Sequence, residues 1–165
     1  MRIGVIADTH VPSRAKKLPA ALVEGLQGVD LILHAGDWVT LDIVQELEKI
    51  APVDGIAGNN DGEEIVRRFG RKKLLTLAGY QIGMVHGDGR SKTTERRAWE
   101  AFKGEGVDVI VFGHSHIPLS RMQDGVLLFN PGSPTDKRRQ PKFSYGIIQL
   151  GETVKANHFF YSDKS

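Results

Sequence analysis

The first part of this chain alternates short apolar runs rich in Ile and Val with longer amphipathic stretches, and this alternation strongly restricts the possible folds. Three of the apolar runs are predicted strands: Arg2–Ala7, Leu31–Leu33 and Val53–Ala57. The stretches after them have apolar residues at helical spacing and are predicted helices: Leu18–Leu26, Thr40–Ile50 and Glu63–Phe69. We expect Pro19 near the first turn of the first helix and Thr40 as the cap of the second. Strands and helices in this order are typical of a parallel sheet with crossover helices.

The second part of the chain has a different pattern, in which strands dominate. The predicted strands are Lys72–Leu77, Gln81–Val85, Asp108–Phe112, Leu119–Met122, Val126–Phe129, Ser144–Leu150 and Val154–Tyr161. A hairpin turn is expected at Ala78–Tyr80 and a helix over Ser91–Lys103. Together the two parts predict an α/β sandwich with two sheets and helices outside. With 165 residues and no linker or repeat, one domain over residues 1–165 is expected.

The composition limits the chemistry that this chain can perform. It contains no cysteine, which excludes a thiolate nucleophile, cysteine-ligated zinc and iron–sulfur centres. The net charge of +2 does not favour a nucleic-acid partner, although the sequence leaves one open. No apolar run approaches the ~18 residues of a membrane span, so no membrane partner is expected. The N-terminal segment reads as a strand rather than an export signal, and the cytoplasm is the expected compartment.

Polar side chains able to bind metal ions follow five of the predicted strands. They are Asp8 and His10, Asp37, Asn59 to Asp61, His86, and finally His114 and His116. Because ligand sites in α/β sheets form at the carboxyl ends of strands, we expect these side chains to meet at one rim. Oxygen and imidazole ligands without thiolate suit Mn²⁺, Fe²⁺, Zn²⁺, Ni²⁺ or Co²⁺. Six or seven such side chains exceed the needs of a single catalytic ion, which favours two ions with a shared carboxylate.

These residues form ordered motifs, D-x-H, G-D, G-N-x-[D/E], H-G and G-H-x-H, across Asp8–His116. The set resembles the calcineurin-like metallophosphoesterases, and most closely their small single-domain bacterial and archaeal phosphodiesterases (YfcE-like). Asn130–Ser133 is similar to the NPGS turn of that subgroup, so the resemblance covers essentially the whole chain. It implies a four-layer α-β-β-α sandwich with two mixed sheets flanked by helices.

The resemblance also implies a role for each candidate residue. Asp8, His10 and His116 would hold one divalent cation, and Asn59, His86 and His114 a second. Asp37 would bridge the two ions, with Mn²⁺ the first choice among the metals named above. Such a centre binds a phosphate oxyanion and acidifies water, which produces a hydroxide that attacks phosphorus. The implied activity is metal-dependent hydrolysis of a small phosphodiester.

One position departs from the motif of many family members. Asn60 stands where they have a histidine, and an amide can donate a hydrogen bond to phosphate but cannot deliver a proton. We therefore expect activated or aryl diesters, whose leaving groups are stable anions, to be the best substrates. Asp61 either orients a ligand or accepts a hydrogen bond.

Alternatives stay open on the sequence alone. One is a protein-interaction scaffold of the same fold, as a retromer subunit of eukaryotes resembles it, and another is a nucleotide phosphatase. His34 is expected in the core or beside the ligands, His158 as structural, and Asp88 as a turn residue or a ligand's partner. Whether the basic residues Lys137, Arg138 and Arg139 contact substrate is open. Exposed strands near the C-terminus leave a homo-oligomer open as well.

Overall fold

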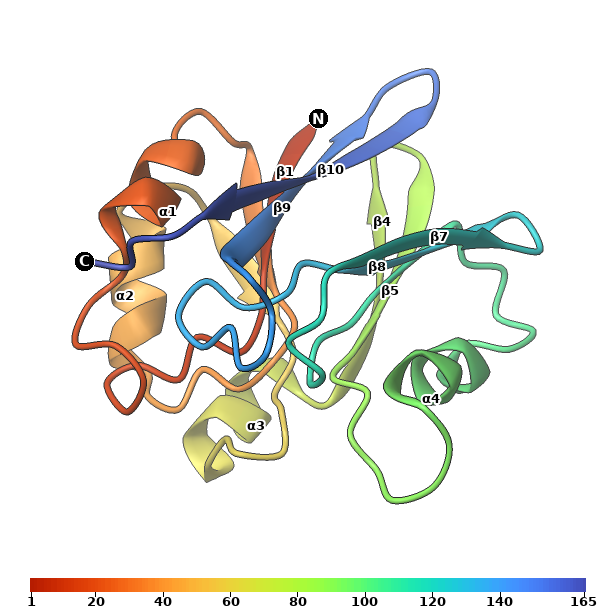
Figure 1. Ribbon diagram of the computed structural model, residues 1–165. Coiled ribbons are helices and arrows are strands. Elements are labelled where there is room, and N and C mark those ends of the chain that lie inside the picture. Colours follow the sequence, from red (N-terminus) through yellow and green to blue (C-terminus); the bar gives the residue numbers. More distant parts are fainter.

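The computed structural model describes residues 1–165 as two five-stranded β-sheets packed face to face (Figure 1). The first sheet has the order β10 (Val154–Tyr161), β9 (Phe143–Leu150), β1 (Arg2–Ile6), β2 (Leu31–His34) and β3 (Val53–Gly55). The second has the order β4 (Lys72–Leu77), β5 (Tyr80–Val85), β6 (Val109–Val111), β8 (Val126–Asn130) and β7 (Leu119–Gln123). Three neighbouring strands are parallel in each sheet, β1 to β3 in one and β5, β6 and β8 in the other, while the remaining strands pair antiparallel. The prediction of two mixed sheets is confirmed.

Four short helices cover the outer faces of the two sheets. Residues of α1 (Ala20–Gly25), α2 (Asp42–Glu48) and α3 (Glu63–Phe69) pack in one hydrophobic cluster with the first sheet. Residues of α4 (Thr94–Ala101) pack in another cluster with the second sheet, on the opposite side of the molecule (Figure 1). This arrangement gives the expected layer order α-β-β-α. No helix has the length and apolar character that a membrane crossing requires.

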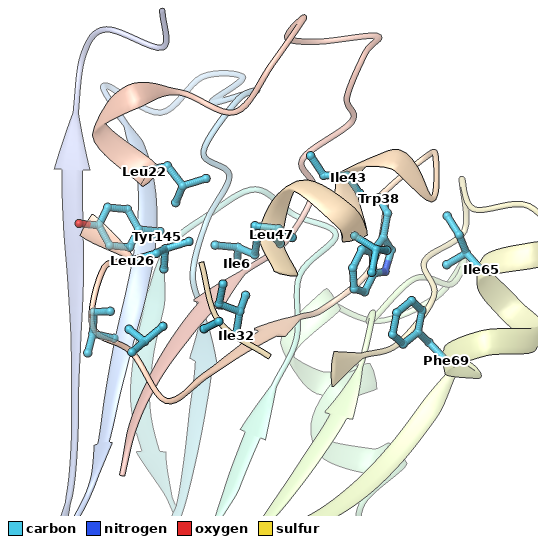
Figure 2. Packing of buried hydrophobic residues seen from close by; sticks show 14 of the residues in the cluster. Ile6, Leu22, Leu26, Ile32, Trp38, Ile43, Leu47, Ile65, Phe69 and Tyr145 are labelled. Atoms are coloured by element: carbon cyan, nitrogen blue, oxygen red, sulfur yellow. The ribbon is translucent and has the colours of Figure 1, made fainter. Parts of the chain in front are cut away.

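The interior of the sandwich follows from the alternation of side chains along each strand. In β1, Ile3 and Val5 point between the sheets and join a cluster with residues of β6 and β8. Ile6 belongs to the other side, where it packs with Ile32 and Leu47 beneath α2 (Figure 2). Strands whose two faces are both covered must be apolar throughout, which explains their continuous Ile and Val runs.

An aromatic stack in the first outer cluster anchors the loop after β2. Trp38 lies between His34 and Phe69, with ring centroids 3.9 Å and 4.4 Å away, and Figure 2 shows Trp38 and Phe69 in the packed interior. The indole Nε1–H donates a hydrogen bond of 2.8 Å to the carbonyl of Ile56, at the end of β3. Since Trp38 directly follows Asp37, this packing fixes the position of a candidate metal ligand.

Three helices, α1, α2 and α4, start two or three residues later than predicted, and α3 starts at Glu63 as predicted. The helix predicted from Thr40 begins at Asp42, and no side chain caps it, because Val39 forms an isolated bridge with Val11 and keeps the chain out of the helix until Leu41. Helix α1 begins at Ala20 rather than at Leu18, and Pro19 is its N-cap residue, next to the first turn as expected. The hairpin prediction is confirmed: Ala78 and Gly79 have φ angles of 50° and 83°, as a tight two-residue turn requires.

Candidate metal centre

The candidate centre lies where the carboxyl ends of parallel strands from both sheets meet. Each predicted residue is in a loop directly after a strand: Asp8 and His10 after β1, Asp37 after β2, Asn59 after β3, His86 after β5, and His114 and His116 after β6. The structure therefore brings together side chains that are up to 108 positions apart in the sequence, from Asp8 to His116.

Two overlapping groups of side chains have their potential ligand atoms within 4.8 Å of one another. One group is Asp8, His10 and His116, and the other is Asp8, Asp37 and His86. In the first, Oδ1 of Asp8 lies 3.6 Å from Nε2 of His116 and 3.9 Å from Nε2 of His10. In the second, Nε2 of His86 lies 3.3 Å from Oδ2 of Asp37 and 3.6 Å from Oδ1 of Asp8. Asp8 thus belongs to both groups, although the sequence predicted a shared position for Asp37 alone.

The atoms that face one another in these groups have no hydrogen-bond partner. Oδ1 of Asp8 and Nε2 of His10, His86 and His116 are all buried and unpartnered. A buried polar atom without a partner costs ~1–3 kcal/mol, so native proteins keep such atoms rare. Four of them converging on one small volume fit bound metal cations, which accept electron pairs from such atoms.

Hydrogen bonds on the far side of two imidazoles fix which nitrogen faces the centre. Nδ1 of His86 lies 2.7 Å from the carbonyl oxygen of Ala35, and Nδ1 of His116 lies 2.6 Å from that of Asp136. A carbonyl oxygen only accepts, so each Nδ1 carries a hydrogen, and each Nε2 faces inward, where the neutral ring offers a lone pair to a metal ion. Metal-binding histidines are held in this way, by a hydrogen bond from the other ring nitrogen.

The ionisation of the site reflects its burial and its crowding. Burial raises the pKa of Asp8 to about 7 and lowers the pKa of His116 to about 4. Burial also opposes the charged form of His86, but the carboxylate of Asp37, 3.3 Å from its Nε2, together with Asp8, raises its pKa to about 9. Burial would raise the pKa of Asp37, yet His86 and two hydrogen bonds from Asn60 hold it below its ordinary value. In this structure, one imidazolium therefore compensates the carboxylate charge, which is the role that a divalent cation would take over.

The backbone is strained at the candidate ligands. Ten residues other than glycine have a positive φ, and half of them are Asp8, His10, Asp37, His114 and His116, with φ between 45° and 69°. This conformation is uncommon for residues with a side chain and costs on the order of 1 kcal/mol or more at each position. Such strain persists where the surrounding structure enforces it, and it concentrates at functional sites.

Three glycines let the ligand loops approach one another closely. Gly36 precedes Asp37, and a Cβ atom there would lie 2.6 Å from Nδ1 of His86. Gly113 precedes His114, and a Cβ atom there would lie 2.8 Å from Oδ2 of Asp8. A Cβ atom at Gly58 would overlap the Asp37 carboxylate. Any side chain at these positions would push the candidate ligands apart.

Asn59 and His114 lie at the outer border of the two groups. Oδ1 of Asn59 is 3.3 Å from Nδ1 of His114, and the His114 ring packs edge-on against the ring of His86, with centroids 5.2 Å apart. Neither residue is in the two groups defined by the 4.8 Å limit. All seven predicted ligands are nevertheless in one continuous cluster.

The two residues after Asn59 make hydrogen bonds that hold Asp37 and the loops around it. The backbone N–H and the side-chain amide of Asn60 donate to the two carboxylate oxygens of Asp37, at 2.9 Å and 3.0 Å. The Asp61 carboxylate accepts three backbone N–H bonds of 2.7–2.8 Å, from Asp37, Val39 and Gly58. Asp61 is therefore buried behind the cluster and holds two ligand loops together, while Asn60 is exposed and faces Asp37.

The segment after Asn130–Ser133 has a supporting role that sequence reasoning missed. The hydroxyls of Ser133 and Thr135 donate to the backbone carbonyls of Asp8 and Thr9, across more than 120 positions of sequence. The next residue supplies the carbonyl that orients His116. The only signal in the sequence was the NPGS turn, which indicated a place near the rim but not these contacts.

The remaining histidines and Asp88 lie outside the cluster. His34 is fully buried, with Nδ1 accepting from the Gly36 N–H and Nε2 2.9 Å from the hydroxyl of Thr9. His158 contacts the carbonyl of Asn130 and stacks on a phenylalanine ring. Both have structural surroundings, as predicted, and Asp88 is exposed and makes no hydrogen bond to a ligand histidine.

With this geometry established, comparison with known proteins gives the family. Residues 1–153 match the profile of the calcineurin-like phosphoesterase superfamily domain. The chain belongs to this superfamily. The predictions of its family and of metallophosphoesterase membership are confirmed.

Two archaeal relatives of this phosphoesterase chain are similar over most of their length. A probable metallophosphoesterase of Methanothermobacter thermautotrophicus is 39% identical over 142 residues, which cover 84% of this chain and 80% of that protein. A phosphodiesterase of Methanocaldococcus jannaschii is 27% identical over 146 residues, covering 80% of this chain and 83% of the relative. Among solved structures, Vps29 of Entamoeba histolytica in complex with Zn²⁺ superimposes with a TM-score of 0.79 at 20% identity, over 97% of this chain and 99% of Vps29. That last likeness concerns the fold.

Proposed function

We propose that this chain is a metal-dependent phosphodiesterase with a dinuclear centre. The observation that carries the proposal is the convergence of four buried, unpartnered ligand atoms, from Asp8, His10, His86 and His116. The donors are oxygen and imidazole nitrogen, and Mn²⁺ is the first expected metal among those that such donors accept. Membership in the calcineurin-like superfamily supports phosphoester hydrolysis as the reaction.

The seven residues divide between two cation positions in this proposal. The first position takes Asp8, His10 and His116, which form one group in the structure. The second takes His86 with Asn59 and His114, which border it. Asp37 contributes to both, since its Oδ2 lies 3.4 Å from Nε2 of His10 and 3.3 Å from Nε2 of His86.

The protein's own groups prepare this centre and limit its substrates. When bound, two divalent cations supply positive charge to the phosphoryl oxygens and lower the pKa of water. Asn60 fixes the carboxylate of Asp37 through two hydrogen bonds, and its exposed amide is available to a phosphoryl oxygen. Because an amide delivers no proton, leaving groups that are stable as anions are favoured, such as aryl oxides.

The scaffold alternative is less well supported. A protein that serves only as an interaction surface does not need seven side chains able to bind metal ions. It also does not need three glycines that let the ligand loops approach closely, or ligands with a strained backbone. The likeness to Vps29 at 20% identity concerns the fold and does not favour that role. A nucleotide phosphatase would gain from a proton donor at the position of Asn60. The cytoplasmic location stays a prediction.

Hydrolysis of bis(p-nitrophenyl) phosphate tests the proposed function. We expect turnover with Mn²⁺, none after EDTA treatment, and recovery when Mn²⁺ is restored. Asp37→Ala should lower the rate at least about 100-fold, since it removes the shared carboxylate, while the far-UV circular dichroism stays that of the wild type. Asp88→Ala, at an exposed position of the same rim, is the control. A metal-loaded protein that hydrolyses no diester would overturn the proposal.

A further inference from the structure

A basic hollow adjoins the metal centre. It has a volume of about 200 Å³ and is lined by Ser115, Ile117, Lys137, Arg138, Arg139 and Gln140. Ser115 lies between the candidate ligands His114 and His116 in the chain, and Arg138 contacts the carbonyl oxygen of His114, so the hollow adjoins the centre. Its basic residues belong to the loop that follows the carbonyl holding His116.

The positive charges of this hollow are not neutralised by the protein. None of its three basic side chains has a carboxylate within 4.0 Å, and the adjacent Asp136 pairs with Arg14 instead. The ammonium of Lys137 lies 5.8 Å from the centre of the Phe143 ring, while Arg138 and Arg139, which also line the hollow, have no such aromatic contact. Both arginines are exposed and open to a ligand.

The guanidinium of Arg138 lies beside the backbone of the candidate ligand His114. The φ of Arg138, 49°, is in the left-handed region, and one guanidinium nitrogen lies 3.5 Å from the carbonyl of His114. A guanidinium this close to two divalent cations would be repelled, unless an anion lies between them.

We infer that this hollow binds a second phosphate group of the substrate, next to the phosphodiester that is hydrolysed. The inference rests on the proposed function and names the substrate class: a phosphodiester that carries a further phosphate monoester on one of its arms. The planar guanidinium groups of Arg138 and Arg139 suit the paired oxygens of phosphate. Ile117 is 50% exposed at the wall of the hollow and offers an apolar contact to the part of the substrate between the two phosphates.

Two matched esters test this inference: thymidine 5′-(p-nitrophenyl phosphate) with and without a 3′-phosphate. They share the bond to be broken and the leaving group, and differ only in the second phosphate. With Mn²⁺, we expect the wild type to have a KM about fivefold lower for the 3′-phosphorylated ester, a modest effect because the arginines are solvent-exposed. In the double variant Arg138→Gln/Arg139→Gln, this preference should fall to nearly one.

The control variant is Arg2→Gln/Lys155→Gln. Arg2 in β1 and Lys155 in β10 both pair with Gln149 of β9, at the end of the first sheet opposite Asp8. Their replacement removes two positive charges, as the arginine double variant does. This control variant should keep the fivefold preference for the 3′-phosphorylated ester. An equal KM for both esters in the wild type, or a preference that survives the loss of both arginines, would overturn the inference while the hydrolysis itself upholds the proposed function.

If the wild type hydrolyses neither ester, binding decides about the hollow, and the proposed function fails only if bis(p-nitrophenyl) phosphate is not hydrolysed either. Calorimetry would then compare thymidine 3′,5′-bisphosphate with thymidine 5′-monophosphate on the same proteins. Tighter binding of the bisphosphate that depends on Arg138 and Arg139 supports the hollow as a phosphate site. Equal binding of the two nucleotides contradicts it.

Discussion

At the scale of single residues, Asp61 shows how a side chain outside the cluster controls the ligands inside it. Its two oxygens accept the backbone N–H groups of Asp37, Val39 and Gly58, which come from the loops after β2 and β3. These two loops carry the candidate ligands Asp37 and Asn59. Their separation is therefore set by one buried carboxylate.

Replacing this carboxylate with an amide should weaken both the fold and the metal site. In Asp61→Asn, the NH₂ group would face at least one backbone N–H that then has no acceptor. We expect a loss of about 1–3 kcal/mol in the free energy of unfolding, measured with urea, because a buried donor is left unpaired. We also expect a loss of about 10–100-fold in Mn²⁺ affinity, measured by calorimetry, since the ligand loops lose their support.

Asp88→Asn is the matched control, since Asp88 is exposed on the same rim and makes no hydrogen bond to a ligand. Both measurements should stay at the wild-type values there. Unchanged Mn²⁺ affinity in Asp61→Asn would show that the ligand loops are positioned by other contacts.

Residue types and spacing were enough to predict the candidate ligands but not their supports. Asp8, His10, Asp37, His86 and His116 meet as expected, because each follows a strand whose apolar pattern is clear. Two of the three bonds of Asp61 reach donors more than 20 positions away, and backbone donors leave no mark on a sequence. The contact of the Asn60 amide with Asp37 was missed because the sequence does not show that these positions, 23 apart, meet.

At the scale of elements, the caps of two helices separate what a sequence can and cannot predict. A threonine precedes both α2 and α4, and both threonines are chemically able to cap a helix. Only Thr93 does so: its hydroxyl accepts the N–H of Arg96 at 3.2 Å. Thr40 is displaced from the cap position because Val39 pairs with Val11.

The two threonines make a matched pair of substitutions. Thr93→Ala should lower the free energy of unfolding by about 1 kcal/mol, since the first turn of α4 loses its side-chain acceptor. Thr40→Ala should change it by less than about 0.5 kcal/mol. Urea denaturation of both variants measures the difference. A larger effect at Thr40 than at Thr93 would contradict the helix starts described above.

The strands were predicted more accurately than the helix ends, for a physical reason. A strand that is covered on both faces must be apolar along its whole length, as in β1 and β6, and this pattern is visible in the sequence. The ends of short helices depend on single contacts with distant segments. Val11 with Val39 is such a contact, and nothing near Thr40 in the sequence reveals it.

At the scale of the whole molecule, the crowded centre makes stability depend on pH when metal is absent. The pKa of His86 is raised from 6.5 to about 9, so its imidazolium stabilises the fold fully below pH 6.5, and this contribution is lost as the pH rises through 9. The pKa of Asp8 is raised from 3.8 to about 7, and the pKa of His116 is lowered from 6.5 to about 4. The contributions of these two residues to stability therefore change mainly below pH 7.

We therefore expect the EDTA-treated protein to lose about 1–3 kcal/mol of unfolding free energy between pH 6.5 and 9. Urea denaturation at several pH values measures it. His86→Gln should remove the dependence in this range. Saturating Mn²⁺ should reduce it, because metal ions bind the unprotonated imidazole and bind only the folded protein. A metal-free protein that becomes more stable from pH 6.5 to 9 would contradict the charge arrangement at His86.

The most direct test of the whole account is an anomalous difference map from a crystal grown with Mn²⁺. The account predicts two peaks about 3.5–4 Å apart, with Asp37 between them. One peak should be bound by Asp8, His10 and His116, and the other by Asn59, His86 and His114. A single peak, or none at these side chains, would contradict the dinuclear centre.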